Sequence, residues 1–347
     1  MNTLIGVGLV AIGAICGGLF ALPSKFVEKT PWEVLWGLFF VFAALLIPVT
    51  GFFFVKGAWE TWSGAGWVIL YPILFGFLWG LGSAAAATAY KLIGISLGFA
   101  IIPGVQVVFG PLIPMFVQHP ETIATTKGMV VILGILVSLA GVIGCGYAGV
   151  LRSRHEEINS DESRPTDTAT ANKAVQMAKG LFVCLFAGLL CACLNFAFSF
   201  GEPILNSSQD IHGNVQAIAT LAVWMPALLG GCLAACGYCI GLLFKNQTWN
   251  AFKQPGIRHV ALLAFLMAAL HDGAIFFYGL GSQYLGVLGV SVGFALLFCG
   301  MMLVGNICGF MTGEWKGAAS ISRRWIMAGV TGLVLGICIL AVGNALT

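Results

Sequence analysis

Long apolar stretches separated by short polar connections make up almost the whole chain. Crossing the hydrocarbon layer of a membrane takes roughly 20 apolar residues in a helix, and ten stretches reach about this length. The pattern predicts an all-α integral membrane protein with ten transmembrane helices, and it leaves no room for a large soluble domain with a catalytic core. The ten stretches cover residues 3–23, 32–55, 67–90, 95–117, 127–150, 179–201, 213–244, 257–281, 286–312 and 322–345.

Composition places the chain in the same class. Hydrophobic residues make up 59% of the 347 residues and charged residues 8%, whereas a soluble domain carries about 25% charged residues. The first apolar stretch follows Met1-Asn2-Thr3, which contains no Lys or Arg, and it is longer than the apolar core of a typical secretory signal. We therefore expect this stretch to be a retained first helix.

A short motif occurs twice and divides the chain into two halves. Trp79-Gly-Leu-Gly-Ser with the later Gly94-Ile-Ser-Leu-Gly-Phe-Ala returns as Tyr278-Gly-Leu-Gly-Ser with Gly289-Val-Ser-Val-Gly-Phe-Ala. Each copy lies where two apolar stretches meet, so the repeating unit is five stretches long. An odd number of spans predicts two inverted five-helix repeats, as in many secondary transporters. We expect a first repeat over residues 1–151, a cytoplasmic linker over 152–178 and a second repeat over 179–347.

The positive charges predict the orientation in the membrane. Fourteen of the sixteen Lys and Arg residues lie in or beside the odd-numbered connections, and only Lys56 and Lys127 lie in the even-numbered ones. Cytoplasmic connections are enriched in Lys and Arg, so we expect both termini to lie outside the cytoplasm. The connection from Arg152 to Lys173 is polar and of mixed charge, which favours an unfolded linker.

Ionisable side chains at membrane depth are costly and point to function. Asp272, beside His271, is near the middle of the eighth stretch and is the deepest carboxylate of the chain. Burial favours the uncharged form of a carboxyl group, so Asp272 is our first candidate for binding a coupling proton. Neutralisation by a nearby cation or by His271, purely for packing, is an equally open alternative. Glu33 is a second proton-coupling candidate, although the helix dipole also explains a carboxylate in a first helical turn.

Few neutral polar groups lie inside the predicted spans. Amides and a carboxylate set against an aromatic face suit a neutral polyol such as a sugar, and no cluster of cations at depth favours a phosphate or a nucleotide. Glu202 and Asn206, at the outer end of the sixth stretch, either face an external entrance or belong to an ordinary solvated loop. The candidate substrate-binding residues are Gln106, Asn195, Trp224, His271 and Asp272.

Other classes of protein are poorly matched. All eleven cysteines lie in apolar spans, where Cys usually acts as a small hydrophobe. The pair Cys236-x-x-Cys239 lacks a second ligand pair, so we expect neither a metal site nor a cofactor. Two other classes stay open: an enzyme would need convergent catalytic groups, of which only the pair His271-Asp272 is present, and a channel would need a continuous polar stripe, which the spans lack.

Five motifs in order resemble the bacterial L-rhamnose-proton symporter family of the drug/metabolite transporter superfamily: Pro23-x-Lys25, Trp32-Glu33-x-x-Trp36, Trp79-Gly-x-Gly82, the run Tyr90–Gly98, and Glu314-Trp315. The resemblance implies proton-coupled uptake of L-rhamnose or a similar deoxy-sugar by alternating access. It also implies a multi-pass protein of the cell inner membrane, with sugar, proton and lipid bilayer as partners and no nucleic acid.

One departure keeps another substrate open. The eighth stretch reads His271-Asp-Gly-Ala-Ile-Phe-Phe-Tyr278, where the family carries a glutamine before a Phe-Phe-Phe-Tyr run. The alternative expectation is a drug/metabolite-type exporter or exchanger of amino acids or other small polar metabolites, since one scaffold can host many substrates.

Overall fold

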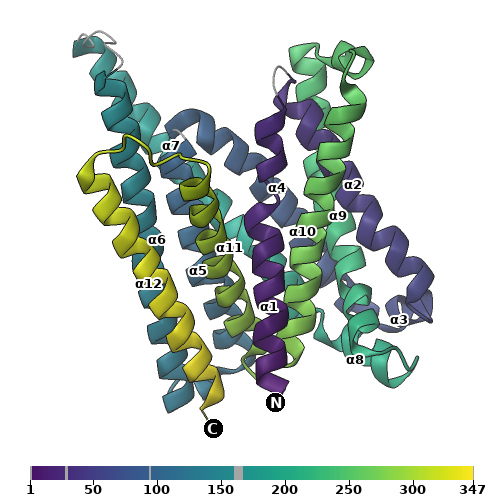
Figure 1. Ribbon diagram of the computed structural model, residues 1–347. Coiled ribbons are helices and arrows are strands. Elements are labelled where there is room, and N and C mark those ends of the chain that lie inside the picture. The colour runs from purple at the N-terminus through teal and green to yellow at the C-terminus, as the bar shows by residue number, and fades with distance from the viewer. Residues whose placement is uncertain (1, 28–29, 94, 160–166, 347) are drawn as a thin grey trace.

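The computed structural model describes residues 2–27, 30–93, 95–159 and 167–346. Figure 1 shows a bundle of long helices with both chain termini at the same end. The long helices are α1 (Asn2–Leu19), α2 (Trp32–Phe54), α4 (Leu70–Ile93), α5 (Ile95–Gln118), α6 (Thr126–Asn159), α7 (Asp167–Phe200), α9 (Gln216–Asn246), α10 (Ile257–Gln283), α11 (Gly289–Met311) and α12 (Ser320–Ala345). Two short helices, α3 (Ala58–Gly64) and α8 (Glu202–Asp210), and 3-10 turns at Leu22–Phe26, Gly66–Ile69, Pro120–Thr122 and Trp249–Lys253 connect them.

The prediction of ten membrane spans is confirmed. Ten helices within the described residues are long and apolar enough to cross a membrane. Each overlaps one of the ten apolar stretches, because a run of about 20 apolar residues can satisfy its backbone in lipid only by hydrogen bonds within the segment.

The expected linker is more ordered than its composition suggests. α6 continues to Asn159 and α7 begins at Asp167, so the expectation of an unfolded segment is wrong for both ends of the Arg152–Lys173 connection. Residues 160–166 lie outside the described ranges. Extending a helix that already exists adds one hydrogen bond for each residue fixed, without the cost of nucleation, which explains why the flanking polar residues continue the membrane helices.

The helices pack in matched pairs across the two halves of the chain. α4 packs against α7 and α9, and α10 packs in the same way against α1 and α2. α5 contacts α6 and α7, while α11 contacts α12 and α1. Exchanging α1 with α7, α2 with α9, α4 with α10, α5 with α11 and α6 with α12 preserves these larger contacts. The smaller contacts α7–α9 and α9–α10 have no counterpart of similar size.

Small residues bring α4 and α9 into close contact. A Cβ atom added at Gly80 would collide with the carbonyl oxygen of Gly231, and one added at Gly76 would collide with that of Ala227. Lipid provides little hydrophobic force between helices, so glycines at such contacts let backbones approach and gain dispersion energy. This contact fixes the position of Trp79, which lies on α4 between the two glycines.

Candidate functional site

Asp272 is buried at the centre of the bundle, and 3% of its surface is exposed. Its Oδ1 lies 3.0 Å from Nδ1 of His271, and its Oδ2 has no hydrogen-bond partner among the described residues. Cys232 of α9 and the backbone of Ile47 in α2 lie close to the carboxyl group. The structure therefore brings His271 and Asp272 together, with one carboxyl oxygen available to hold a proton or a ligand.

Three aromatic rings surround the imidazole of His271. Trp79 of α4 stacks on it, with ring centroids 5.3 Å apart and 22° between the planes. Phe39 of α2 and Phe20, directly after α1, lie 5.4 Å and 5.8 Å from it. We call Phe20, Phe39 and Trp79 the aromatic box. Because its members come from three parts of the first half of the chain, the box holds His271 of α10 in one orientation.

Asn195 is an anchor between helices. Its side chain is fully buried, its Nδ2 donates to the carbonyl oxygen of Gly110 at 2.8 Å, and its Oδ1 accepts a hydrogen bond from the Tyr278 hydroxyl. Pro114 has no N–H, so the Gly110 carbonyl loses its ordinary partner within α5. Asn195 supplies the missing donor, which leaves both ends of its amide engaged by protein groups.

Trp224 belongs to a second aromatic group. It stacks on Phe198 with ring centroids 4.7 Å apart and 14° between the planes, and Tyr278 lies 6.2 Å from it. We call Phe198, Trp224 and Tyr278 the ring layer. Trp224 is fully buried, and its Nε1 has no partner within the described part of the chain. A Cβ atom at Gly279 would collide with this nitrogen, so the glycine permits the close packing.

The remaining two candidates are Gln106 and Glu33. Gln106 is buried on α5, one turn before Gly110, and no hydrogen bond joins it to the other candidates among the residues that the structure describes. Glu33 is 5% exposed in the first turn of α2 and accepts hydrogen bonds from Asn246 at 2.9 Å and Thr248 at 2.7 Å. It precedes Ile47 by roughly 20 Å of helix, so Glu33 and Asp272 do not share a site.

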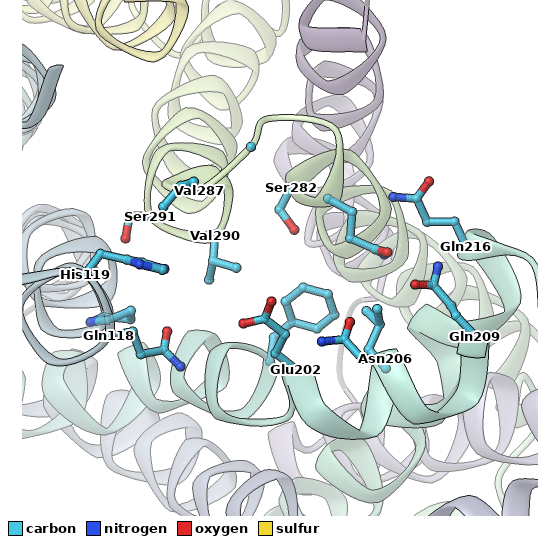
Figure 2. Close-up of a pocket in the computed structure, with 15 residues that line it drawn as sticks. Gln118, His119, Glu202, Asn206, Gln209, Gln216, Ser282, Val287, Val290 and Ser291 are labelled. Carbon is cyan, nitrogen blue, oxygen red and sulfur yellow. The ribbon is translucent and has the colours of Figure 1, made fainter. Parts of the chain in front are cut away.

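A polar pocket of about 420 Å³ opens between α5, α8, α9, α10 and α11. Figure 1 places α8 at the end of the bundle that carries both termini. In Figure 2, Glu202, Asn206 and Gln209 of α8 face Ser282 and Ser291 across the pocket. The lining is rich in amides and includes Phe198 from the ring layer. Its polar members are Gln118, His119, Glu202, Asn206, Gln209, Gln216, Ser282, Gln283 and Ser291.

Most of this pocket is absent from the sequence-based candidates. Glu202 and Asn206 lie on α8 and line the pocket, while an external position of this pocket stays a prediction. Gln118, Gln209 and Gln283 were missed. One signal was available: Glu202, Asn206 and Gln209 follow the i, i+4, i+7 spacing of one helix face, whereas Ile204 and Ser208 are buried.

Charged residues close the opposite end of the bundle. Lys25, just after α1, pairs with Glu314 in the α11–α12 connection. Arg152 of α6 lies 3.7 Å from the Glu314 carboxylate, and its guanidinium lies 5.2 Å from the centroid of the Trp315 ring. We call Lys25, Arg152 and Glu314 the ionic clasp. It joins two of the sequence motifs, Pro23-x-Lys25 and Glu314-Trp315, which are far apart in the chain.

Comparison with known proteins gives one consistent match. The model of the family described as L-rhamnose-proton symport protein (RhaT) matches residues 1–346. A protein of Pectobacterium atrosepticum named L-rhamnose-proton symporter is 26% identical over 353 residues, covering 99% of this chain and 98% of that protein. Proteins of the same name from Yersinia pestis (25% over 356 residues; 99% and 100% covered) and Mannheimia succiniciproducens (24% over 353 residues; 99% and 99%) are similar along their whole length.

Proposed function

The chain belongs to the L-rhamnose-proton symport protein family, and we propose that it takes up L-rhamnose, or a similar deoxy-sugar, together with protons. The family and the names of the relatives support this function. They do not favour the alternative of an exporter or exchanger of amino acids. A symporter uses the proton as its coupling ion, and its partners are the sugar, the proton and the bilayer, without a cofactor or a nucleic acid.

Asp272 is the residue that we propose to carry the coupling proton or to contact sugar hydroxyls. The observation that carries this assignment is a carboxyl group 3% exposed, in the middle of α10, with one oxygen beside His271 and the other without a partner in the described ranges. A charge at this depth is costly. The carboxyl group therefore favours the neutral, protonated state until the site opens to water.

The aromatic box provides a surface for sugar beside Asp272. Apolar faces of sugar rings pack on aromatic rings while hydroxyls bond to polar groups at the edge of the site. His271 and Trp79 offer such a combination, and Trp224 would contact a sugar passing the ring layer. Asn195 and Gln106 remain candidate substrate contacts. The Asn195 amide must give up its hydrogen bonds to protein groups before it can bind a sugar hydroxyl. Glu33 remains a candidate only for a separate proton step.

The arrangement of the helices supports alternating access between two halves of the chain. The exchange of counterpart helices that preserves the larger contacts supports two inverted repeats, residues 1–151 and 179–347, joined by a cytoplasmic linker over 152–178. Together with the charge bias of the connections, it supports a protein of the inner membrane with both termini outside the cytoplasm. In this orientation the polar pocket faces outward and the ionic clasp closes the cytoplasmic end.

Purified protein in proteoliposomes tests the function directly. Adding L-rhamnose outside should drive protons inward, and Asp272→Asn should abolish this proton movement because an amide cannot take up and release a proton. The matched control is Asp210→Asn, an exposed carboxylate at the end of α8. Unchanged proton movement and unchanged sugar affinity in Asp272→Asn would make Asp272 a packing residue.

A further inference from the structure

The polar pocket and Asp272 are two separate places along α10. Asp272 and Gln283 share a helix face at an i, i+11 spacing, which separates them by roughly 16 Å along the axis. The ring layer lies between them: Phe198 belongs both to the ring layer and to the pocket lining, and it is 3% exposed. Tyr278 lies between Asp272 and Gln283 along α10, and Phe198, which packs against Tyr278, is the member of the ring layer that lines the pocket.

Three of the five amides that line the pocket are free to bind a ligand, whereas Gln118 is engaged at both ends by Ser199. Asn206, Gln209 and Gln216 make no side-chain hydrogen bond with any residue of the described ranges, and all three line the pocket. Gln283 donates its amide nitrogen to Thr220, which leaves its carbonyl oxygen as an acceptor. An amide both donates and accepts hydrogen bonds, and so does each hydroxyl of a sugar.

The rest of the lining narrows the chemical class of the ligand. No Lys or Arg lines the pocket, so it does not suit a phosphate or another anion. Glu202 adds one carboxylate, which accepts hydrogen bonds from hydroxyls, and Phe198 adds an aromatic floor for an apolar face. A volume of about 420 Å³ lies within the range of roughly 300–1,000 Å³ that is usual for small-molecule sites.

We propose that this pocket is a loading site, where a neutral monosaccharide binds before the ring layer opens toward Asp272. Asn206, Gln209, Gln216 and Gln283 bond its hydroxyls, and Phe198 contacts its apolar face. The identity of the sugar rests on the proposed function, but the binding chemistry of the pocket does not. The transported sugar is thus recognised twice, first by amides and then by the aromatic box and Asp272.

Calorimetric titration of the purified full chain tests the loading site. The ligands are L-rhamnose and a panel of neutral hexoses and 6-deoxyhexoses. Asn206→Ala and Gln209→Ala should each raise the Kd of the bound sugar roughly threefold to tenfold, the effect of losing one hydrogen bond. Gln254 is an exposed amide near the start of α10, and Gln254→Ala should leave the Kd of the sugar unchanged. Val287→Trp, at an exposed position of the lining, should fill the pocket and abolish binding.

The outcomes separate this inference from the proposed function. Sugar binding that is insensitive to Gln209→Ala, Asn206→Ala and Val287→Trp would overturn the loading site, as would a wild-type protein that binds none of the sugars. If L-rhamnose nevertheless drives proton movement in liposomes, the proposed function stands without the loading site. If a sugar binds through these amides but no proton moves with it, the loading site stands and the symport function fails.

Discussion

The imidazole of His271 lies nearly flat on the indole of Trp79, with ring centroids 5.3 Å apart. The two residues come from α10 and α4, and each of these helices carries the start of one copy of the repeated motif. Trp79 begins one copy of the repeated motif and Tyr278 begins the other. Trp79 belongs to the aromatic box and Tyr278 to the ring layer, so the first residues of the two motif copies supply one ring to each aromatic group.

Removing the Trp79 ring should weaken sugar transport. Aromatic pairs contribute about 0.5–1.5 kcal/mol beyond the area that they bury, so Trp79→Ala should leave His271 loosely held and raise the KM for L-rhamnose by up to about tenfold, with Trp79→Phe close to wild type. Uptake of labelled L-rhamnose into cells measures the KM of both variants. Trp67→Ala is the control, because Trp67 is 84% exposed. Equal KM values for Trp79→Ala and wild type would exclude a role for the stack.

Asn195 should matter for stability. Asn195→Ala leaves the Gly110 carbonyl without its donor, while the Tyr278 hydroxyl keeps the Val290 carbonyl as an acceptor. An unsatisfied buried polar group costs about 1–3 kcal/mol. Thermal unfolding in detergent should therefore begin several degrees earlier than in wild type. Asn206→Ala removes an amide of the same kind from an exposed position and should unfold as wild type does. If Asn195→Ala and Asn206→Ala unfold at the same temperature, the Asn195 anchor does not contribute to stability.

The ionic clasp should bias the protein toward the state with an open pocket. Exposed ion pairs contribute about 0–1 kcal/mol. Glu314→Gln should therefore lower the ratio of the state with an open pocket to the state with a closed pocket by up to about fivefold. A smaller population of the binding-competent state raises the apparent Kd by the same factor, although Glu314 is remote from the pocket. Lys25→Met should shift the Kd of L-rhamnose in the same direction. Opposite shifts, or none, would show that the clasp does not gate access.

The contact between α4 and α9 should tolerate no larger residue at Gly80. Gly80→Ala must push the two backbones apart, because its Cβ would collide with the Gly231 carbonyl, and close helix packing in lipid depends on such glycines. We expect lower thermal stability and weaker L-rhamnose uptake. Gly237→Ala on α9 meets no atom within 4 Å and should be neutral. A fully active, stable Gly80→Ala protein would contradict the packing argument.

Some of the site could be found from sequence and some could not. The depth of Asp272 and the neighbour His271 follow from their place within one apolar stretch, so both were identified. Asn195 was chosen by the same rule, but its partners come from α5 and α10. Whether a buried amide is free or engaged depends on carbonyls that other helices expose, such as the one that Pro114 leaves open. No pattern within α7 contains that information.

The sequence by itself determined the class of the protein, the ten spans and the resemblance to its family, because the length of an apolar run sets its partition into lipid and its helical form without reference to other segments. Only the tertiary structure decided that three polar side chains of α8 line a pocket, that Phe198 of the ring layer lines it too and that Lys25 meets Glu314. Each of these depends on contacts between helices far apart in the chain, and the packing energy of whole helices, rather than any local pattern, selects those contacts.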